Sequence, residues 1–208
     1  MILSITTFII FTVWTYLTTL ISQHPFWSVI AACLISLGIY RTLATLLLEV
    51  FRNISFIKKW ILGPYFMEGT WVGFFVGHNN KIRLFCEIFE QDLSDLVVKG
   101  KAFKEDGSYY GYWNSDSVNI NVRQGTLSYT YNADVIGNTS INPGLARFNL
   151  ERSSKNKSPH RMFGYSSDLF SPKKLKAFED KISDSTDLES ADVFAKAKEI
   201  LMKYKDHI

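Results

Sequence analysis

The stretch that decides the fold is MEGTWVGFF, residues 67–75, which is the first strand-like sequence in the chain. Its Gly-Thr-Trp sequence and the residues that follow are typical of the opening strand of a small antiparallel barrel that closes around a ligand. We expect Gly73 to relieve crowding inside such a barrel and Trp71 to pack at its floor or end. Because a long apolar leader precedes this strand directly, the chain joins two regions of different composition.

The leader is residues 1–48, which contain no Asp or Glu and one basic residue, Arg41. Residues 2–21 are apolar or hydroxylated, and residues 26–48 supply a second run; each is close to the roughly 20 residues needed to cross a bilayer. Ser22-Gln23-His24-Pro25 separates them. The leader therefore predicts a hairpin of two transmembrane helices over 1–48.

Three other interpretations of the leader have less support. A cleaved signal peptide would carry a basic start and a shorter apolar core, but the chain begins MILSITTFII. The string VIAAC, which ends at Cys33, resembles a lipoprotein cleavage box, yet apolar sequence continues beyond it. A buried soluble hairpin would show a polar face on its helices.

Basic residues predict the orientation of the two spans. The loop around His24 has no Lys or Arg, whereas Arg41, Arg52, Lys58 and Lys59 lie within or after the second span. Because such residues stay on the cytoplasmic side, both termini are expected in the cytoplasm. Residues 49–67 are expected to form an amphipathic linker that continues the second span or lies along the headgroups.

From residue 68 to 170 the hydrophobic pattern has period two, which indicates strands with one buried face. Turn residues separate about eight such segments, which favours a seven- or eight-stranded antiparallel barrel. The expected strands are 69–76, 81–90, 96–103, 109–113, 118–123, 126–135, 145–152 and 161–165. Residues 171–208 predict a C-terminal helical segment, with Ser171-Pro172 as a helix start and a second helix from Ser190.

The residue pattern gives little support to catalysis. The four histidines and two cysteines lack metal-ligand spacing, and no nucleophile elbow, P-loop or dinucleotide motif is present. We therefore expect no enzyme, no metal site and no cofactor. The net charge of +3 is also too small to favour binding of a nucleic-acid polymer.

The residue pattern supports a ligand-binding site better than a catalytic one, because tyrosines and arginines are frequent in the strand region. Aromatic faces stack on nucleobases, and guanidinium groups bind phosphates through paired hydrogen bonds. Alternation places Tyr129 and Tyr131 on the inner face with Leu127, and places Tyr110 and Tyr112 on one common face. It places Arg123 and Arg147 on the face opposite their apolar neighbours, which argues against a position inside the barrel. The candidate ligand-binding residues are Tyr110, Tyr112, Tyr129, Tyr131, Arg123, Arg147 and Arg161.

Two spans, a short amphipathic linker and a strand-rich domain that opens on EGTWVGFF resemble one known family. It is the two-transmembrane, β-strand-rich effector of bacterial cyclic-oligonucleotide anti-phage signalling (CBASS). The resemblance covers the architecture of the whole chain, and Gly69-Thr70-Trp71-x-Gly73 is its sharpest local element. Lipocalin-like barrels also begin with Gly-x-Trp, so this element is only moderately specific.

The resemblance implies a mechanism. A partner nucleotidyltransferase makes a cyclic dinucleotide on infection, the cytosolic barrel binds it, and the protein self-associates and disrupts the inner membrane. The alternative is a membrane-tethered, lipocalin-like module for an apolar ligand or lipid. Cavity polarity separates the two hypotheses, because an interior of Leu, Ile and Phe with no buried guanidinium would favour the apolar ligand.

Overall fold

A computed structural model describes residues 2–20, 25–77, 81–135, 142–170 and 173–204 of the chain. The chain divides into two compact units, Met1–Ile54 and Ser55–Ile208. The first unit is helical, and the second contains a short helix, a β-barrel and a C-terminal helix.

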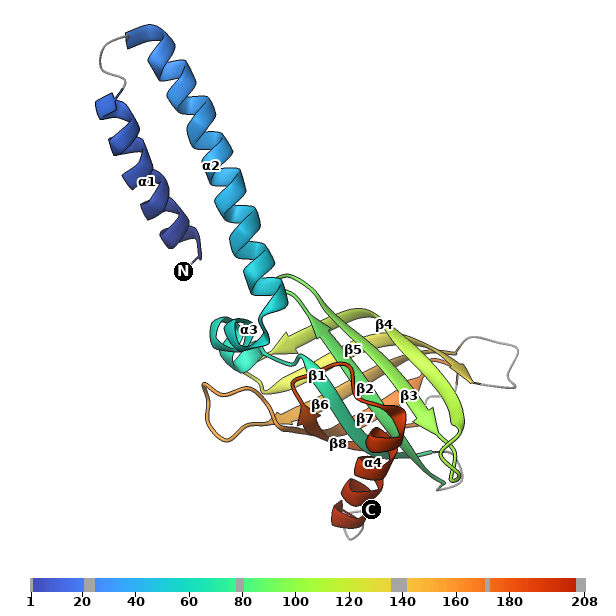
Figure 1. The fold of residues 1–208 in the computed structure, drawn as a ribbon. Coiled ribbons are helices and arrows are strands. Elements are labelled where there is room, and N and C mark those ends of the chain that lie inside the picture. The colour runs from blue at the N-terminus through green and yellow to red at the C-terminus, as the bar shows by residue number, and fades with distance from the viewer. Residues whose placement is uncertain (1, 21–24, 78–80, 136–141, 171–172, 205–208) are drawn as a thin grey trace. The chain divides into compact units, whose positions relative to one another are not determined.

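The N-terminal unit consists of α1 (Ile2–Leu20) and α2 (Pro25–Asn53), which lie alongside each other (Figure 1). Threonine hydroxyls along α1 donate to carbonyls three or four residues earlier, as Thr15 does to Phe11 at 3.0 Å. Among the described residues, Ala32–Arg52 is long and apolar enough to cross a membrane, and Thr7–Tyr16 is a shorter apolar stretch. The structure thus contains one candidate apolar N-terminal helix, which could be a span or a signal sequence.

The predicted linker over 49–67 is not one continuous helix. The chain leaves α2 at Asn53, enters α3 (Ser55–Leu62), and then forms the 3-10 turn η1 (Gly63–Tyr65). Lys58 is buried on α3, whereas Phe56 and Trp60 are 78% and 66% exposed. Lys58 can be buried because its ammonium group has polar partners in the barrel.

Eight antiparallel strands close into a barrel within the described part of the chain, each paired with its sequence neighbours and β1 paired with β8. This confirms the predicted antiparallel barrel. The strands are β1 (Gly69–Val76), β2 (Ile82–Gln91), β3 (Leu96–Phe103), β4 (Tyr109–Asn121), β5 (Thr126–Val135), β6 (Asn142–Glu151), β7 (Arg161–Asp168) and β8 (Leu175–Ser183).

Two strand assignments differ from the sequence prediction. The predicted strands 109–113 and 118–123 are one strand, β4, with a register shift between Ser115 and Ser117 where it pairs with β5. The helix predicted from residue 171 is wrong, since Leu175, Phe178 and Ile182 lie on β8, which closes the barrel to β1. Their apolar spacing suits either helix or strand, and β8 is favoured because it pairs the otherwise open edges of β1 and β7.

The single described C-terminal helix is α4 (Ser190–Tyr204), which confirms the helix predicted from Ser190. It packs on the outer face of the barrel over β1 and β2 (Figure 1). Val193, Ala197 and Ile200 of α4 share a buried cluster with Val72 and Phe74 of β1. The barrel thus has an apolar core on both sides of its first strands, one inside and one under α4.

One end of the barrel interior is filled with side chains. Trp71 is fully buried there, packs with Met67 and Phe89, and donates from Nε1 to the Met67 carbonyl at 2.9 Å. Its position confirms the expectation that it packs at the floor or end. Gly73 leaves room inside as expected, since a Cβ there would lie 1.8 Å from the Phe178 carbonyl oxygen.

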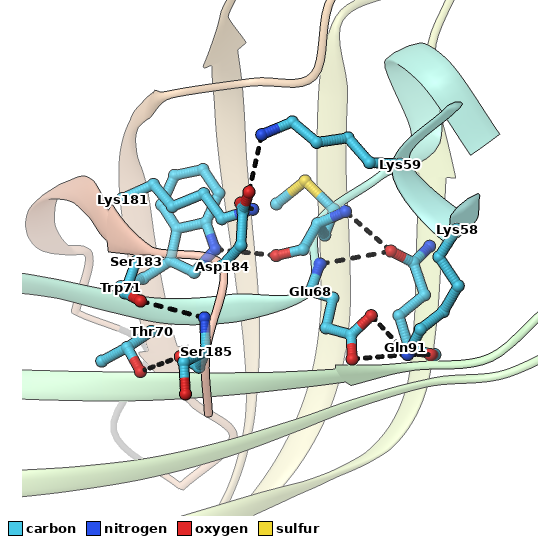
Figure 2. Close-up of polar contacts among 11 residues, drawn as sticks. Lys58, Lys59, Glu68, Thr70, Trp71, Gln91, Lys181, Ser183, Asp184 and Ser185 are labelled. Atoms are coloured by element: carbon cyan, nitrogen blue, oxygen red, sulfur yellow. Dashed lines mark hydrogen bonds and ion pairs between the residues drawn. The ribbon is translucent and has the colours of Figure 1, made fainter. Parts of the chain in front are cut away.

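Polar side chains fasten α3 and the entry to β1 across this filled end (Figure 2). Lys58 pairs with Glu68 and donates to the Gln91 carbonyl at 3.0 Å. The Gln91 amide accepts from Met67 N at 2.7 Å and donates to the Tyr65 carbonyl at 2.9 Å. Because these contacts satisfy backbone groups that no strand pairs, they fix the path by which the chain enters the barrel.

Candidate functional site

The other half of the barrel contains a cavity of about 370 Å³. Volumes of this order are typical of small-molecule sites. Many of its wall residues are aromatic, and charged and polar residues lie among them. The lining includes Phe75, Phe85, Tyr110, Trp113, Tyr129, Tyr131 and Phe148, together with Lys81, Arg83, Glu87 and Asp168.

Tyr129 and Tyr131 lie on the inner face of β5 and line the cavity, as their alternation predicts. Their ring centroids are 6.1 Å apart, and the Tyr129 ring stacks on Phe148 at 6.2 Å. The Tyr131 hydroxyl donates to Asp168 Oδ1 at 3.0 Å. Burial and the charge of Asp168 raise the pKa of Tyr131, so it remains a neutral phenol that can donate a hydrogen bond.

Tyr110 and Tyr112 both line the cavity, but they are buried to different degrees. The β3–β4 register shifts where Phe103 pairs with Tyr109, so that Tyr110 packs against the interior cluster. Tyr112 is 49% exposed, and its hydroxyl donates to Asp134 Oδ2 at 2.8 Å. Both tyrosines therefore lie at the cavity, although a local irregularity beside Tyr110 interrupts the period-two alternation from which their common face was predicted.

The three predicted arginines lie away from the cavity lining. Arg123 is exposed in the turn between β4 and β5, and Arg147 is exposed on β6, as the alternation indicated. Arg161 donates to Asp180 and Glu151, and its guanidinium lies 5.0 Å from the Tyr204 ring centroid. It therefore ties α4 to the outside of the barrel, and its role as a ligand-binding residue stays a prediction.

The guanidinium that does reach the cavity belongs to Arg83 of β2. It lies 4.5 Å from the centroid of the Tyr110 ring and is half-buried. Lys81, immediately before this strand, also lines the cavity. These two cations give one side of the cavity a positive charge, which suits an anionic group on a ligand.

The sequence analysis did not predict two acidic side chains that lie in the barrel interior. Glu87 of β2 and Glu179 of β8 are 1% and 0% exposed. Trp113 Nε1 donates to Glu87 Oε1 at 2.8 Å, and the Tyr129 hydroxyl donates to the same oxygen. A signal was present, because Glu87 alternates with Phe85 and Phe89 on one face of its strand.

Glu87 and Glu179 are close enough in the barrel interior for each to affect the pKa of the other. Burial raises the pKa of Glu87 to about 7, against the lowering effect of the hydrogen bonds from Tyr129 and Trp113. Burial, followed by the charge of Glu87, raises the pKa of Glu179 well above its ordinary value. At neutral pH the pair therefore holds a proton, chiefly on Glu179.

Glycines make room for two of the aromatic walls. A Cβ on Gly100 would lie 1.8 Å from Trp113 Cε2, and a Cβ on Gly144 would lie 2.3 Å from Tyr131 Cζ. Gly100 and Gly144 are the cross-strand partners of Trp113 and Tyr131. The absence of a side chain at each glycine therefore allows the ring to lie across the barrel wall.

Within the described part of the chain, no group of three or more His, Cys, Asp or Glu side chains could hold a metal ion. Comparison with protein-family models, with curated proteins and with solved structures finds no match for the chain. The fold and cavity define the class of the second unit as a small, closed antiparallel β-barrel with a cavity lined in part by aromatic side chains.

Proposed function

We propose that the chain is a membrane-tethered sensor and effector whose barrel binds a cyclic dinucleotide in the cytosol. Binding shifts the protein to a self-associating state, and the N-terminal helices then disrupt the bacterial inner membrane and kill the infected cell. This is the anti-phage role implied by the resemblance to CBASS effectors. The observation that carries it is the cavity, in which aromatic walls meet the cations Lys81 and Arg83.

A cyclic dinucleotide suits these surfaces. Its bases have flat faces that can stack on Tyr129, Tyr131 or Trp113, at roughly 1–3 kcal/mol for each stacked base. Its phosphates can pair with Arg83 and Lys81, and a guanidinium binds phosphate through two parallel hydrogen bonds. The cavity can take a base deeply while the phosphates stay near the two cations.

The competing candidate is a lipocalin-like module for an apolar ligand or lipid. The many aromatic rings in the lining favour it. Glu87, Asp168 and Arg83 in the same lining count against it, because an alkyl chain would desolvate them without offering hydrogen bonds. The polar groups thus favour a nucleotide over a lipid.

We place two transmembrane spans over 1–48, with both termini in the cytoplasm, on the basis of the apolar runs and the basic residues after them. The charge rule for cytoplasmic loops supports this orientation. α3 follows α2 after one residue, Ile54, so its start must lie close to the point where α2 leaves the membrane. Its exposed Phe56 and Trp60 are one helical turn apart and suit the lipid headgroup region.

The effector acts without catalysis in this proposal, and a partner nucleotidyltransferase supplies its ligand. A ligand can drive self-association only through higher affinity for the associated state than for the resting state. The hairpins of several copies then cluster in the membrane, where small and hydroxylated side chains allow close helix packing. Such residues include Thr15, Thr18, Ser36 and Gly38.

The test uses the full chain reconstituted in lipid vesicles that hold a self-quenched dye. A panel of cyclic dinucleotides with adenine, guanine, cytosine or uracil bases is titrated by calorimetry and then added to the vesicles. We expect at least one member to bind and to release the dye, and linear dinucleotides of the same bases to do neither. Binding of long-chain fatty acids instead, with no response to any cyclic dinucleotide, would support the lipocalin-like alternative.

A further inference from the structure

Asp168 is the last residue of β7, and its side chain faces the barrel cavity. Every second residue of this strand points inward: Met162 belongs to the interior cluster, and Ser166 and Asp168 line the cavity. The cations of the same lining, Lys81 and Arg83, lie before and on β2, which β1 and β8 separate from β7. The carboxylate and the two cations therefore lie on different walls of one cavity.

This carboxylate has no cationic partner in the protein. Among the described residues, no Lys, Arg or His forms an ion pair with Asp168. An unpaired carboxylate repels the phosphates of an anionic ligand, so its presence in such a cavity lowers affinity unless the ligand also offers it a hydrogen-bond donor. A ligand with an N–H group can do so, because a hydrogen bond to a charged acceptor is stronger than one between neutral groups.

The two oxygens of Asp168 differ in what they can offer. Oδ1 accepts a hydrogen bond from the Tyr131 hydroxyl at 3.0 Å. No described residue donates a hydrogen bond to Oδ2, and this atom, unlike Glu87 Oε2, is not enclosed by the protein. The hydrogen bond to Oδ1 joins two side chains that both line the cavity. Oδ2 is therefore an open acceptor at the cavity wall, within reach of a ligand.

The surroundings hold this acceptor in one place before a ligand arrives. The Tyr131 ring lies against the backbone of Gly144, where a Cβ would lie 2.3 Å from Tyr131 Cζ. Burial and the charge of Asp168 raise the pKa of Tyr131, so its hydroxyl keeps the proton that it donates. The backbone after Asp168 is fixed as well, since Leu169 N donates to the Pro143 carbonyl at 2.8 Å. Because a fixed donor holds Oδ1, the protein also sets the direction of Oδ2.

We propose that Asp168 selects the ligand, and that the cavity takes a planar nitrogen base whose exocyclic amino group donates to Asp168 Oδ2. This inference rests on the proposed function and narrows it to cyclic dinucleotides with at least one amino-bearing base. Adenine, guanine and cytosine each carry such a group. Uracil has a carbonyl oxygen where cytosine has its amino group, and that oxygen repels a carboxylate.

The distribution of charge in the cavity orients such a ligand. Its base can stack on Tyr129 or Tyr131, and Tyr131 is the residue that holds Asp168. Its phosphates then turn toward Lys81 and Arg83 on the other wall and away from the carboxylate. One wall of the cavity therefore recognises the base, and the other attracts the anionic backbone.

The experiment compares ligands that differ by the amino groups alone, with the full chain in nanodiscs. The cyclic dinucleotide that binds most tightly in the calorimetric panel is titrated beside an analogue that lacks these groups. In the analogue, unsubstituted purine replaces adenine, hypoxanthine replaces guanine, and 2-pyrimidinone replaces cytosine. We expect the amino-bearing ligand to bind tenfold or more tightly than its analogue, because the analogue leaves the carboxylate desolvated without a donor.

Asp168→Asn should abolish or reverse this preference. The Tyr131 hydroxyl holds the amide oxygen at the Oδ1 position, so the amide NH₂ takes the place of Oδ2 and offers a donor where the base needs an acceptor. The variant should bind the amino-bearing ligand tenfold or more weakly than the wild-type chain does, and the analogue at least as tightly. Glu105→Gln, in the exposed turn between β3 and β4, is the matched control for loss of one acidic group and should keep the preference.

Equal affinity of the wild-type chain for the ligand and its analogue would overturn this inference and leave the proposed function intact. So would cyclic di-UMP as the tightest ligand, a preference that survives Asp168→Asn, or equal weakening of both ligands by that substitution. If Asp168→Asn does not fold, the wild-type comparison of ligand and analogue decides alone. A wild-type chain that binds no cyclic dinucleotide would overturn the inference and the proposed function together.

Discussion

The indole of Trp113 lies directly against the backbone of Gly100, its partner across the β3–β4 pair. A Cβ at position 100 would lie 1.8 Å from Trp113 Cε2. The same indole donates to Glu87 Oε1 at 2.8 Å. Gly100 on β3 thus leaves room for the Trp113 ring on β4, and that ring positions Glu87 on β2. Three neighbouring strands together hold this acidic side chain in place.

We expect Gly100→Ala to displace Trp113 and to lower the free energy of unfolding by about 1–3 kcal/mol, as overpacking usually does. The same substitution in a Trp113→Ala background should cost far less, because the clash is absent. Chemical denaturation of the four chains in detergent measures this double-mutant cycle. Equal costs in the two backgrounds would show that the indole does not constrain position 100.

Neighbouring lysines of α3 should differ sharply in what their removal costs. Lys58 has a side chain 5% exposed and pairs with Glu68, whereas Lys59 has a side chain 46% exposed and pairs with Asp184 at 2.6 Å. Lys58→Ala leaves Glu68 unpaired in a largely buried place, at a cost of about 3 kcal/mol. Lys59→Ala should cost under about 1 kcal/mol, as exposed pairs do.

Thermal unfolding of both lysine variants, followed by circular dichroism, checks this difference. Similar shifts in melting temperature for the two variants would contradict it. Because Lys58 also donates to the Gln91 carbonyl, Lys58→Ala should increase hydrogen exchange at the amide of Met67, which the Gln91 side chain holds.

The stability of the barrel should fall as the pH rises from about 4.5 to about 7. Burial raises the pKa of Glu87 from 4.5 to about 7, so the folded chain binds more protons than the unfolded chain in this window. Unfolding then becomes easier as the pH rises. The groups that face Glu87 are Glu179, Trp113 and Tyr129, and none of them is a cation.

Melting temperature measured against pH tests this expectation, with Glu105→Gln as the control that keeps the slope. The double variant Glu87→Gln, Glu179→Gln should have a flatter profile in the same window. Ion pairs lower the pKa values of Asp180 and Asp184 below 3.8, so their contribution is lost at more acidic pH and does not mask the effect. A melting temperature of the wild-type chain that rises with pH through this window would contradict the interpretation that the folded Glu87–Glu179 pair holds a proton.

Arg83 and Arg147 form a matched pair of arginines inside and outside the site. Arg83 lies over Tyr110 and lines the cavity, whereas Arg147 is exposed on β6. Arg83→Ala should weaken binding of the tightest cyclic dinucleotide tenfold or more, since it removes a charged hydrogen bond to phosphate. Arg147→Ala should leave the affinity unchanged in calorimetry. The reverse result would restore Arg147 to the site.

Trp60 should lie at lipid headgroup depth if α3 rests on the membrane. Lipids brominated near the headgroup quench nearby indoles, so the quenched part of the fluorescence should fall in Trp60→Phe. It should not fall in Trp113→Phe, because that indole is inside the barrel. No difference between the two variants would remove the proposed membrane contact of Phe56 and Trp60.

Local sequence patterns predict much of the barrel. The alternation of β2, β3 and β5 places Phe85, Val98 and Tyr129 inward, and turn residues separate the strands. The inner position of Tyr131 and the packing of Trp71 at one end follow from the same period. Such features are local, because the two faces of a strand differ in their surroundings wherever one side is buried.

The predictions that were wrong or missing concern features that depend on residues far away in the sequence. Leu175 to Ile182 has a spacing that both a helix and a strand accept, and its pairing with β1 makes it β8. The β3–β4 register shift beside Tyr110 interrupts the alternation of β4, and nothing in the sequence of β4 indicates it. Lys58 is buried because Glu68 and the Gln91 carbonyl, 10 and 33 residues away, satisfy its charge.

The chain sequence therefore specifies an apolar leader, a barrel and its inward tyrosines, since each follows from composition or from a period of two. The cavity chemistry required the closed barrel. Glu87 and Glu179 are 92 residues apart in sequence, and β1, which pairs with both of their strands, brings them together. Burial then gives them a shared proton, because the free energy of an acidic group depends on its surroundings in three dimensions.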